Sequence, residues 1–350
     1  MSFATFRRIR SVAFGSVVGL LLGGLVTAVA PAGASQSTHR HAAKSLPAAE
    51  LALVSYSTPQ AAFTDIIAAF QKTTVGKNIT FTQSYGASGD QSRAVLAGQP
   101  ADVVEFSLAP DITRLVDGGI VDASWDANQY KGFVTKSVVV IATRSGNPKG
   151  IKDWPDLVKK GVEVITPNPF TSGGARWNVM AAYGANSKVG KNNKAGVAYL
   201  NKLFKNVPVQ DDSARVSLQT FTSGKGDALL SYENDAIFAQ QKNVPLDYVI
   251  PKNTILIENP VAVTKTSKHP KQAKAFVDFL YSKTAQKIFA KNGYRPVVSG
   301  VVSKGKFKTP SGLFTIDQLG GWTAATTKFF DPNKGIVAGI ERGIGVSTSK

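Results

Sequence analysis

Residues 166–178, TPNPFTSGGARWN, combine hydroxyl, glycine and basic side chains at what we expect to be a helix start, after an apolar strand over residues 162–165. The first N–H groups of a helix have no acceptor within it, and the helix dipole is positive at that end. Gly173 and Gly174 have no side chains to keep a ligand away. The segment therefore predicts either an anion-binding corner or an ordinary helix capped by Ser172.

Three further turns share this character, each rich in small hydroxyl residues or glycine and each placed before an expected helix. They are Ser55–Thr58, Gly86–Gly89 and Asp212–Arg215. Ligands of open α/β sheets bind beyond the carboxyl ends of the strands, where loops meet helix N-termini. Four such turns favour a binding site over a set of plain caps.

Short apolar strands alternate with helical segments along the chain, which predicts an α/β fold with mixed, mainly parallel sheets flanked by helices. The strands are expected at residues 51–55, 79–83, 102–106, 137–142, 162–165 and 227–231. The alternation restarts after residue 146, and extended segments near 254–257 and 261–263 look like a return to the first half. We expect a first lobe over 50–136, a second over 137–253, and over 254–350 the return to lobe 1 and C-terminal helices.

The N-terminus resembles an export signal, because Arg7, Arg8 and Arg10 precede an uncharged run that ends in Ala-Gly-Ala at residue 34. We expect residues 1–34 to be cleaved, although the run is long enough to be retained as an anchor. Residues 35–49 should form a flexible tail. The sequence has no Cys, which excludes disulfides, thiolate metal sites and a lipid on an N-terminal cysteine. A periplasmic or secreted location follows.

The formal charge is +18, and removing residues 1–34, with three arginines and no acids, leaves +15. Such a charge suits nucleic acid, anionic surfaces or small anions. The lysines are dispersed, with no zinc-finger spacing and no aromatic-interleaved basic motif. We therefore expect no nucleic-acid partner.

The sequence gives little support for a catalytic site. The three histidines are His39 and His41 in the expected tail and His269 beside a proline in a lysine-rich loop, so a Ser-His-Asp site has no credible base. The G-x-S-x-G elbow, the phosphate-loop motif and metal-ligand clusters are absent from the sequence. We expect no enzyme activity, no cofactor and no metal, while a Ser-Lys hydrolase without a recognisable motif stays open.

Nine segments occur in an order that resembles the sulfate/thiosulfate-binding proteins of bacterial ABC importers, a family of periplasmic solute-binding proteins. The resemblance covers nearly all of residues 51–329, and TPNP-x-x-SGGARWN is its most specific part. The segments are SYSTPQAAF, QSYGASGDQ, ADVVEFSLAPDI, GNPKGIKDW, VITPNPFTSGGARWN, DDSAR, LLSYENDA, NGYRPV and FTIDQLGGW.

The resemblance implies a two-lobed, type 2 periplasmic-binding-protein fold that closes at a hinge on a dehydrated dianion held by neutral donors. Carried over by position, the second lobe would supply the Ser172 hydroxyl and the N–H groups of Gly173, Gly174 and Ala214. Ser88 would contribute from the first lobe.

Two positions depart from the family pattern. Where the family has S-Y-D-P, this chain has Ser57 after Tyr56, and its backbone N–H can still donate. Where the family has a ligand-binding tryptophan, this chain has Tyr232. A tryptophan only donates, whereas a tyrosine hydroxyl also accepts. Tyr232 therefore predicts either weaker exclusion of protonated oxyanions or a simple packing replacement.

Three arginines, Arg176, Arg215 and Arg295, are expected behind the donors, paired with acids or stiffening the turns, with Glu233 and Asp212 as candidate partners. Trp154, Trp177 and Trp322 are expected to be packing residues.

The function that the resemblance implies is capture of sulfate or thiosulfate by a monomer that delivers it to the membrane permease of an ABC importer. The alternatives are another tetrahedral oxyanion, such as molybdate or phosphate, on the same fold, a secreted serine hydrolase, and a structural or adhesive surface protein.

Overall fold

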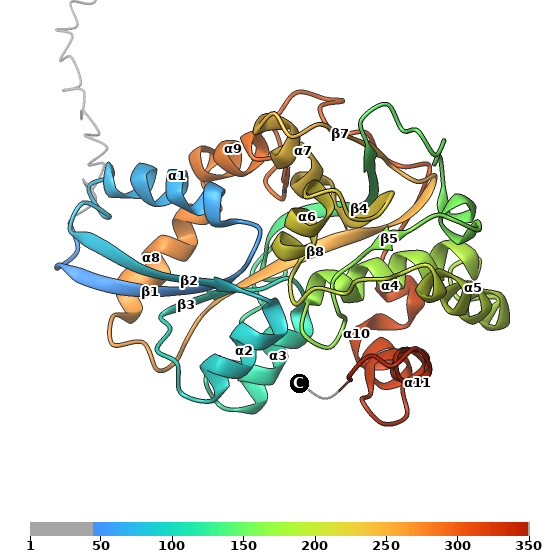
Figure 1. Cartoon of the computed structure of the whole chain (residues 1–350). Coiled ribbons are helices and arrows are strands. Elements are labelled where there is room, and N and C mark those ends of the chain that lie inside the picture. The colour runs from blue at the N-terminus through green and yellow to red at the C-terminus, as the bar shows by residue number, and fades with distance from the viewer. Residues whose placement is uncertain (1–44, 349–350) are drawn as a thin grey trace, which may run out of the picture. The chain divides into compact units, whose positions relative to one another are not determined.

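A mixed ten-stranded sheet, with strand order β2-β1-β3-β8-β4-β6-β5, organises the computed structural model, which describes residues 45–348 (Figure 1). β10 pairs with β8, while β7 and β9 pair with β4. The strands are β1 Ala49–Tyr56, β2 Ile79–Gly86, β3 Val103–Glu105, β4 Phe133–Arg144, β5 Val164–Ile165, β6 Ala228–Tyr232, β7 Leu246–Val249, β8 Asn253–Val263, β9 Arg295–Pro296 and β10 Gly312–Phe314.

Helices lie between these strands. They are α1 Gln60–Gln71, α2 Ser88–Leu96, α3 Ala109–Asp117, α4 Gly173–Asn186, α5 Asn193–Lys205, α6 Ala214–Thr222, α7 Glu233–Gln241, α8 Pro270–Leu280, α9 Lys283–Lys291, α10 Gly321–Ala325 and α11 Ile336–Gly343. Shorter turns are η1 Trp154–Val158, η2 Asp317–Leu319 and η3 Thr326–Phe330. Within residues 45–348, no helix is both long and apolar enough to cross a membrane.

Two long strands connect the halves of the sheet. The first part of β4 pairs antiparallel with β8, and its second part pairs with β6 and β7. The end of β8 pairs with β3, next to β1 and β2. Because β4 and β8 each run through both halves, the expected lobe boundaries at 136/137 and 253/254 fall within or at the start of continuous strands. Those boundaries stay predictions.

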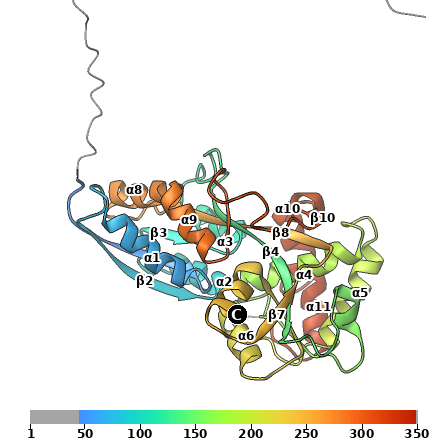
Figure 2. The same cartoon turned by 90° about the horizontal axis from the view of Figure 1, so that it is seen from above.

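The first half is held by an aromatic core between the sheet and α1, α8 and α9, which lie together in Figure 2. In α1 the apolar residues recur at helical spacing, so one face of the helix is buried. Phe63 meets Phe289 edge-on at 5.8 Å, and Phe70 meets Phe276 at 5.2 Å between ring centroids. These contacts fix α1, whose preceding turn is one of the candidate site turns.

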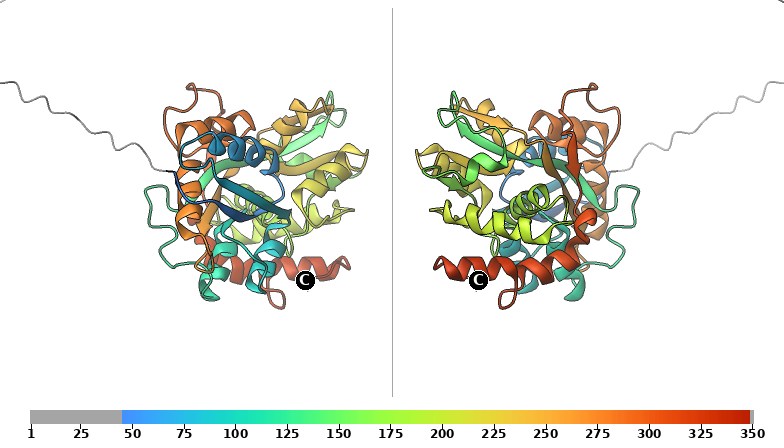
Figure 3. Two further views of the ribbon diagram at one scale, coloured as in Figure 1. Left: turned by 90° about the vertical axis from the view of Figure 1, so that its left-hand side faces the viewer. Right: turned by 90° about the vertical axis from the view of Figure 1, so that its right-hand side faces the viewer.

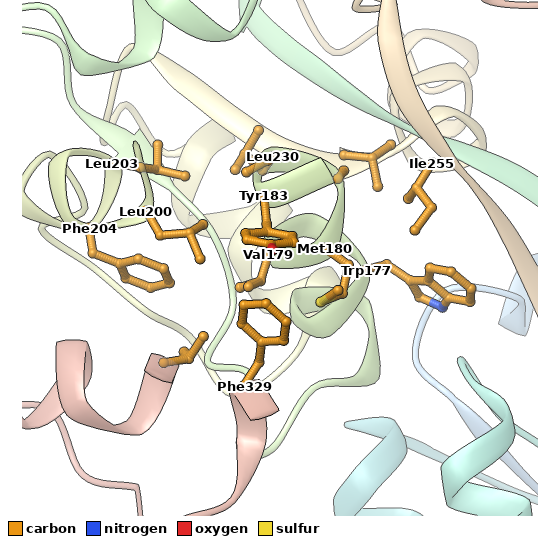
Figure 4. Packing of buried hydrophobic residues seen from close by; sticks show 14 of the residues in the cluster. Trp177, Val179, Met180, Tyr183, Leu200, Leu203, Phe204, Leu230, Ile255 and Phe329 are labelled. Atoms are coloured by element: carbon orange, nitrogen blue, oxygen red, sulfur yellow. The ribbon is translucent and has the colours of Figure 1, made fainter. Parts of the chain in front are cut away.

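The second half has its core around α4, where Trp177, Met180 and Tyr183 pack against α5, β6 and β8 (Figure 4). The C-terminal helices belong to this core. The ring centroids of Trp322 and Trp177 are 4.6 Å apart, and those of Phe329 and Tyr183 are also 4.6 Å apart. In Figure 3 the red C-terminal helix lies beneath α4 and α5. The helix that starts at the Ser-Gly-Gly turn is therefore covered on several sides.

The strands expected from the sequence are present with bounds shifted by a few residues, and the segments expected near 254–257 and 261–263 form the single strand β8. The sheet is mixed, as expected, but it is not mainly parallel: β4 pairs antiparallel with β6, β7, β8 and β9, and β3 with β8, because β4 and β8 cross between the halves. The chain is already tied down inside the expected tail: the Leu46 and Pro47 carbonyls accept hydrogen bonds from Asn78 and Gln272, and β1 starts at Ala49. The expected export signal over residues 1–34 and most of the tail lie outside the described residues. The separate helix α9 has no counterpart among the expected elements.

Gln286 on α9 provides a test of how this half is held together. The side chain is fully buried; its Nε2 donates to the Val134 and Leu280 carbonyls at 2.9 Å each, and its Oε1 accepts from the Val297 N–H at 3.0 Å. Gln286→Leu leaves these backbone groups unpaired, so we expect a loss of about 1–3 kcal/mol in the free energy of unfolding, measured by urea denaturation. Gln219→Leu, on an exposed position of α6, is the control; an equal loss there would contradict the assignment.

Candidate functional site

Each of the four candidate turns directly precedes a helix, as expected. The turn at residues 55–58 leads into α1, residues 86–89 into α2, residues 171–174 into α4 and residues 212–215 into α6. The helix starts therefore present their unpaired N–H groups from both halves of the sheet.

The starts of α4 and α6 are built alike. Ser172 caps α4 by accepting from the Ala175 N–H at 3.3 Å, and Ser213 caps α6 by accepting from the Val216 N–H at 3.3 Å. The caps satisfy the third N–H of each helix, and the first two N–H groups precede any acceptor within the helix. Gly173 and Gly174 on α4, with Ala214 on α6, therefore keep donors directed beyond the helix ends.

The structure brings four of the expected donors to one place. A methyl group added to Gly174 would lie 3.4 Å from Ser172 Oγ, 3.6 Å from Tyr232 Cε1 and 3.7 Å from Ala214 Cβ. Atoms of Ser172, Ala214 and Tyr232 therefore surround the space beside Gly174, and a side chain at Gly174 would reach into that space.

Cross-links between the two turns keep them in register. The Thr171 hydroxyl donates to the Asp212 carbonyl at 2.8 Å, and the Asn168 N–H donates to the Asp211 carbonyl at 2.8 Å. The Asp211 carboxylate in turn accepts from Ser217 and Thr220 on α6. The start of α6 is thereby fixed against the start of α4.

The first half contributes differently from what its hydroxyl groups suggest. The Ser88 hydroxyl donates to Asp111 Oδ2 at 2.6 Å and accepts from the Ser107 N–H at 3.0 Å. With the hydroxyl engaged inside its own half, the group that Ser88 can offer a ligand is its N–H, as the first residue of α2. Ser57 lies within the turn that leads into α1 and is buried, with 9% of its surface exposed.

Several hydrogen bonds run between the halves at this point. The Gly89 N–H donates to the Thr171 carbonyl at 3.0 Å, and Arg215 Nη2 donates to the Thr58 carbonyl at 2.9 Å. Trp177 Nε1 donates to the Ser107 carbonyl at 2.8 Å. The candidate donors from the two halves therefore lie at a closed junction.

Tyr232 is the last residue of β6, with 2% of its surface exposed, and its hydroxyl lies 2.5 Å from Ser107 Oγ. Burial raises its pKa well above the usual value, while hydrogen bonds with the Ser107 and Asn259 side chains oppose that rise. The phenol is therefore neutral and keeps its hydrogen at physiological pH.

The three expected arginines are each held by other groups of the protein, and one of them pairs with an expected acid. Arg295 Nε pairs with Glu233 Oε2 at 2.8 Å, which confirms Glu233 as a partner. Arg215 Nη2 lies 3.3 Å from Oδ1 of the buried Asp235, an acid that the sequence did not single out.

Arg176 holds the turn through a backbone carbonyl and an aromatic ring. Its Nε donates to the Pro169 carbonyl at 2.9 Å, and its guanidinium lies 5.0 Å from the centre of the Phe330 ring. Burial lowers the pKa of Arg176 to about 10, which leaves the group charged at neutral pH. Of the packing residues, Trp154 and Trp177 are buried, and Trp322 packs against Trp177.

The site presents neutral donors rather than charged ones. The seven expected ligand residues, Ser57, Ser88, Ser172, Gly173, Gly174, Ala214 and Tyr232, carry no ionic side chain. Nearby Glu105 is fully buried and accepts from the Ser55 hydroxyl at 2.6 Å. Burial raises the pKa of Glu105 well above its usual value, which favours the neutral form of this carboxyl.

Sequence reasoning missed Ser107, Asn259 and Asp235. Ser107 follows the β3 strand at its carboxyl end, which is where ligand-binding side chains are expected, so its position was available as a signal. Asn259 lies inside β8 and Asp235 in the first turn of α7; neither carried a motif. Within residues 45–348, no cluster of His, Cys, Asp or Glu is arranged to hold a metal ion.

Comparison with known proteins identifies the family of this chain. The family described as bacterial extracellular solute-binding protein matches residues 51–295. A protein of Synechococcus elongatus named sulfate-binding protein is 44% identical over 80% of this chain and 83% of its own length. The chain belongs to the bacterial extracellular solute-binding protein family.

A solved structure and a second relative agree with this assignment. The sulfate-binding protein SubI from Mycobacterium tuberculosis H37Rv superposes with a TM-score of 0.79 at 44% identity, covering 81% of this chain and 99% of SubI. A Pseudomonas aeruginosa protein named thiosulfate-binding protein is 36% identical over 79% of this chain and 88% of its own length. The two-lobed α/β fold expected of this solute-binding protein is thereby confirmed.

One buried carboxyl ties the loop before α6 to the C-terminal helix. Gln210 Nε2 donates to Glu341 Oε2 at 2.7 Å, and Glu341 is fully buried on α11. Burial raises the pKa of Glu341 from 4.5 to about 7, and the Gln210 hydrogen bond only partly opposes this. The protonated carboxyl is therefore the form that the folded state prefers.

Glu341 should make stability depend on pH. Its contribution to folding is fully present below pH 4.5 and is lost as the pH rises through about 7, where the buried group ionises. We expect Glu341→Gln to reduce the fall in the free energy of unfolding between pH 5 and pH 8, measured by urea denaturation across that range. Glu50→Gln, at an exposed position, is the control. An unchanged slope in the Glu341 variant would contradict the role given to burial.

Proposed function

We propose that this protein is an extracytoplasmic receptor that captures sulfate between its two lobes, with thiosulfate as a second ligand, and delivers it to an ABC importer. The observation that carries the proposal is the convergence of Ser172, Gly174, Ala214 and Tyr232 at two helix starts. The names of the relatives, sulfate-binding and thiosulfate-binding protein, support the choice of ligand.

The physical basis is a set of fixed dipoles. A dianion taken out of water loses strong hydration, and N–H groups aimed at one point can replace it without reorganising. Each hydrogen bond to a charged group contributes about 1.5–3 kcal/mol. Gly173 and Gly174 let the anion approach the backbone, and the Ser172 hydroxyl, which accepts from the Ala175 N–H, still has its hydrogen to donate.

Closure of the lobes completes the site. The first lobe would add the N–H groups of Ser57 and Ser88, so that the ligand binds the closed arrangement more tightly than the open one. The Gly89–Thr171 and Arg215–Thr58 hydrogen bonds form only when the lobes meet. A monomer that closes in this way presents the permease with a distinct loaded shape. We further propose export by residues 1–34, and a binding rather than catalytic role.

Sulfate binding and its dependence on Ser172 are the primary test. We expect sulfate and thiosulfate to raise the melting temperature, because a ligand at about 100 times its Kd stabilises by ~2.7 kcal/mol. Ser172→Ala should weaken sulfate binding by about 1–3 kcal/mol, measured by calorimetry, through loss of one donor to a charged group.

The control for Ser172→Ala is Ser282→Ala, which removes an equivalent serine cap from α9, where Ser282 Oγ accepts from the Ala285 N–H. Both variants lose a cap, but only Ser172→Ala should lose affinity. A wild-type protein that responds to none of sulfate, thiosulfate, molybdate and phosphate would overturn the receptor proposal.

Gly89 tests closure separately from ligand contact. A methyl group there would lie 2.7 Å from the Thr171 carbonyl oxygen of the other lobe. Gly89→Ala should leave the ligand-free melting temperature unchanged or higher, since alanine favours helices, and raise the Kd for sulfate about tenfold or more. Calorimetry and small-angle scattering with and without sulfate measure the two effects. Gly339→Ala in α11, where a methyl group meets nothing within 4 Å, should not change the Kd.

A further inference from the structure

Two buried hydroxyl groups from opposite halves meet at the candidate site. Ser107 follows β3 and has 1% of its surface exposed, while Tyr232 ends β6 and has 2% exposed; their oxygens lie 2.5 Å apart. Either hydroxyl can be the donor in this contact. The direction of the hydrogen bond is thus not dictated by the residue types.

The pair borders the glycine turn that supplies the anion donors. A methyl group on Gly173 would lie 3.0 Å from Ser107 Oγ, and one on Gly174 would lie 3.6 Å from Tyr232 Cε1. The pair therefore packs directly against the turn whose N–H groups would hold an anion in the proposed site.

The neighbours of the pair hold its heavy atoms in place. The Ser107 carbonyl accepts from Trp177 Nε1 at 2.8 Å and from Asn259 Nδ2 at 2.9 Å. Asn259 Oδ1 accepts from the Thr135 hydroxyl at 3.1 Å, which orients the amide so that its NH₂ faces Ser107 and Tyr232. The oxygens are fixed, and only the hydroxyl hydrogens are free to rotate.

Rotation of those hydrogens gives the pair two states. When Ser107 donates to Tyr232, the tyrosine hydrogen is free to donate to an unprotonated anion. When Tyr232 donates to Ser107, a tyrosine lone pair can accept a hydrogen from a protonated anion. In both states the Ser107–Tyr232 hydrogen bond is kept.

We propose that the Ser107–Tyr232 pair widens the ligand range of this receptor to protonated tetrahedral oxyanions, with hydrogen phosphate as the principal additional ligand beside sulfate. The inference rests on the proposed function, since it concerns the same site. A donor-only group at position 232 would leave the hydrogen of such an anion without an acceptor, which is costly in a buried site. A lone tyrosine without Ser107 would accept that hydrogen but leave its own unpaired.

Ser107→Ala is the decisive variant, because it removes the alternative acceptor and leaves the tyrosine able to donate. Its Kd values for sulfate and selenate, two unprotonated dianions, are the reference. The ratio of the Kd for phosphate to this reference, at pH 6 to 8 where phosphate carries at least one hydrogen, should rise about tenfold or more over wild type. Calorimetry of each anion measures this ratio.

Two further variants test whether Tyr232 acts through its hydroxyl or only through packing. Tyr232→Trp places a donor without an acceptor there and should weaken phosphate binding more than sulfate binding. Tyr232→Phe should weaken both anions. Ser223→Ala, an exposed hydroxyl on the second half, is the control and should change neither. Melting temperatures check that each variant is folded, and Ser107→Ala alone suffices for the test if a tyrosine variant does not fold.

The outcomes distinguish this inference from the function beneath it. If wild type binds neither sulfate nor selenate, the proposed function fails. If wild type binds sulfate but shows no binding of phosphate at about 10 mM, only the extended ligand range fails. The Kd for phosphate would then exceed about 10 mM, a binding free energy weaker than about −3 kcal/mol. Equal losses of sulfate and phosphate in Ser107→Ala would also overturn it, because the hydroxyls would then act as plain donors.

Discussion

The N–H groups at the starts of α4 and α6 must find an acceptor, and much of the surrounding structure follows from that requirement. A buried donor without a partner costs about 1–3 kcal/mol, yet Ser172 and Ser213 satisfy only the third N–H of each helix. The bonds from Thr171 and Asn168 to the α6 turn hold the remaining donors together. The acceptor we propose is a small anion, because an anion can take several such hydrogen bonds at once.

Neutrality at the site contrasts with the strong positive charge of the whole chain. Arg215 pairs with Asp235, and Arg295 pairs with Glu233. The positive charge of each guanidinium is therefore compensated by a neighbouring carboxylate. Burial raises the pKa of both Glu105 and Tyr232, which favours their neutral forms. In the proposed site, neutral donors rather than charged side chains would hold the ligand, while the many lysines of the chain attract anions in general.

The arrangement of strands explains how two distant sets of donors meet. β4 and β8 pass through both halves of the sheet, so a bend along this pair would move α1 and α2 as a unit relative to α4 and α6. The aromatic cores beside these helices keep each half rigid: Phe63 and Phe276 on one side, Trp177 and Tyr183 on the other. Rigid halves joined by continuous strands suit a receptor whose ligand fixes one relative position.

The sequence by itself determined the alternation of strands and helices, the four turns, and the cap at Ser172, because these depend on local patterns of apolar spacing and on helix starts. It also identified Glu233 as the acid of an arginine pair. Only the tertiary structure decided that the Ser88 hydroxyl is used by Asp111 and Ser107, that Arg215 pairs with Asp235, and that Ser107 reaches Tyr232. The last contact joins residues 125 positions apart, whose proximity arises when the sheet assembles and the halves meet; no local pattern encodes a distance of that kind.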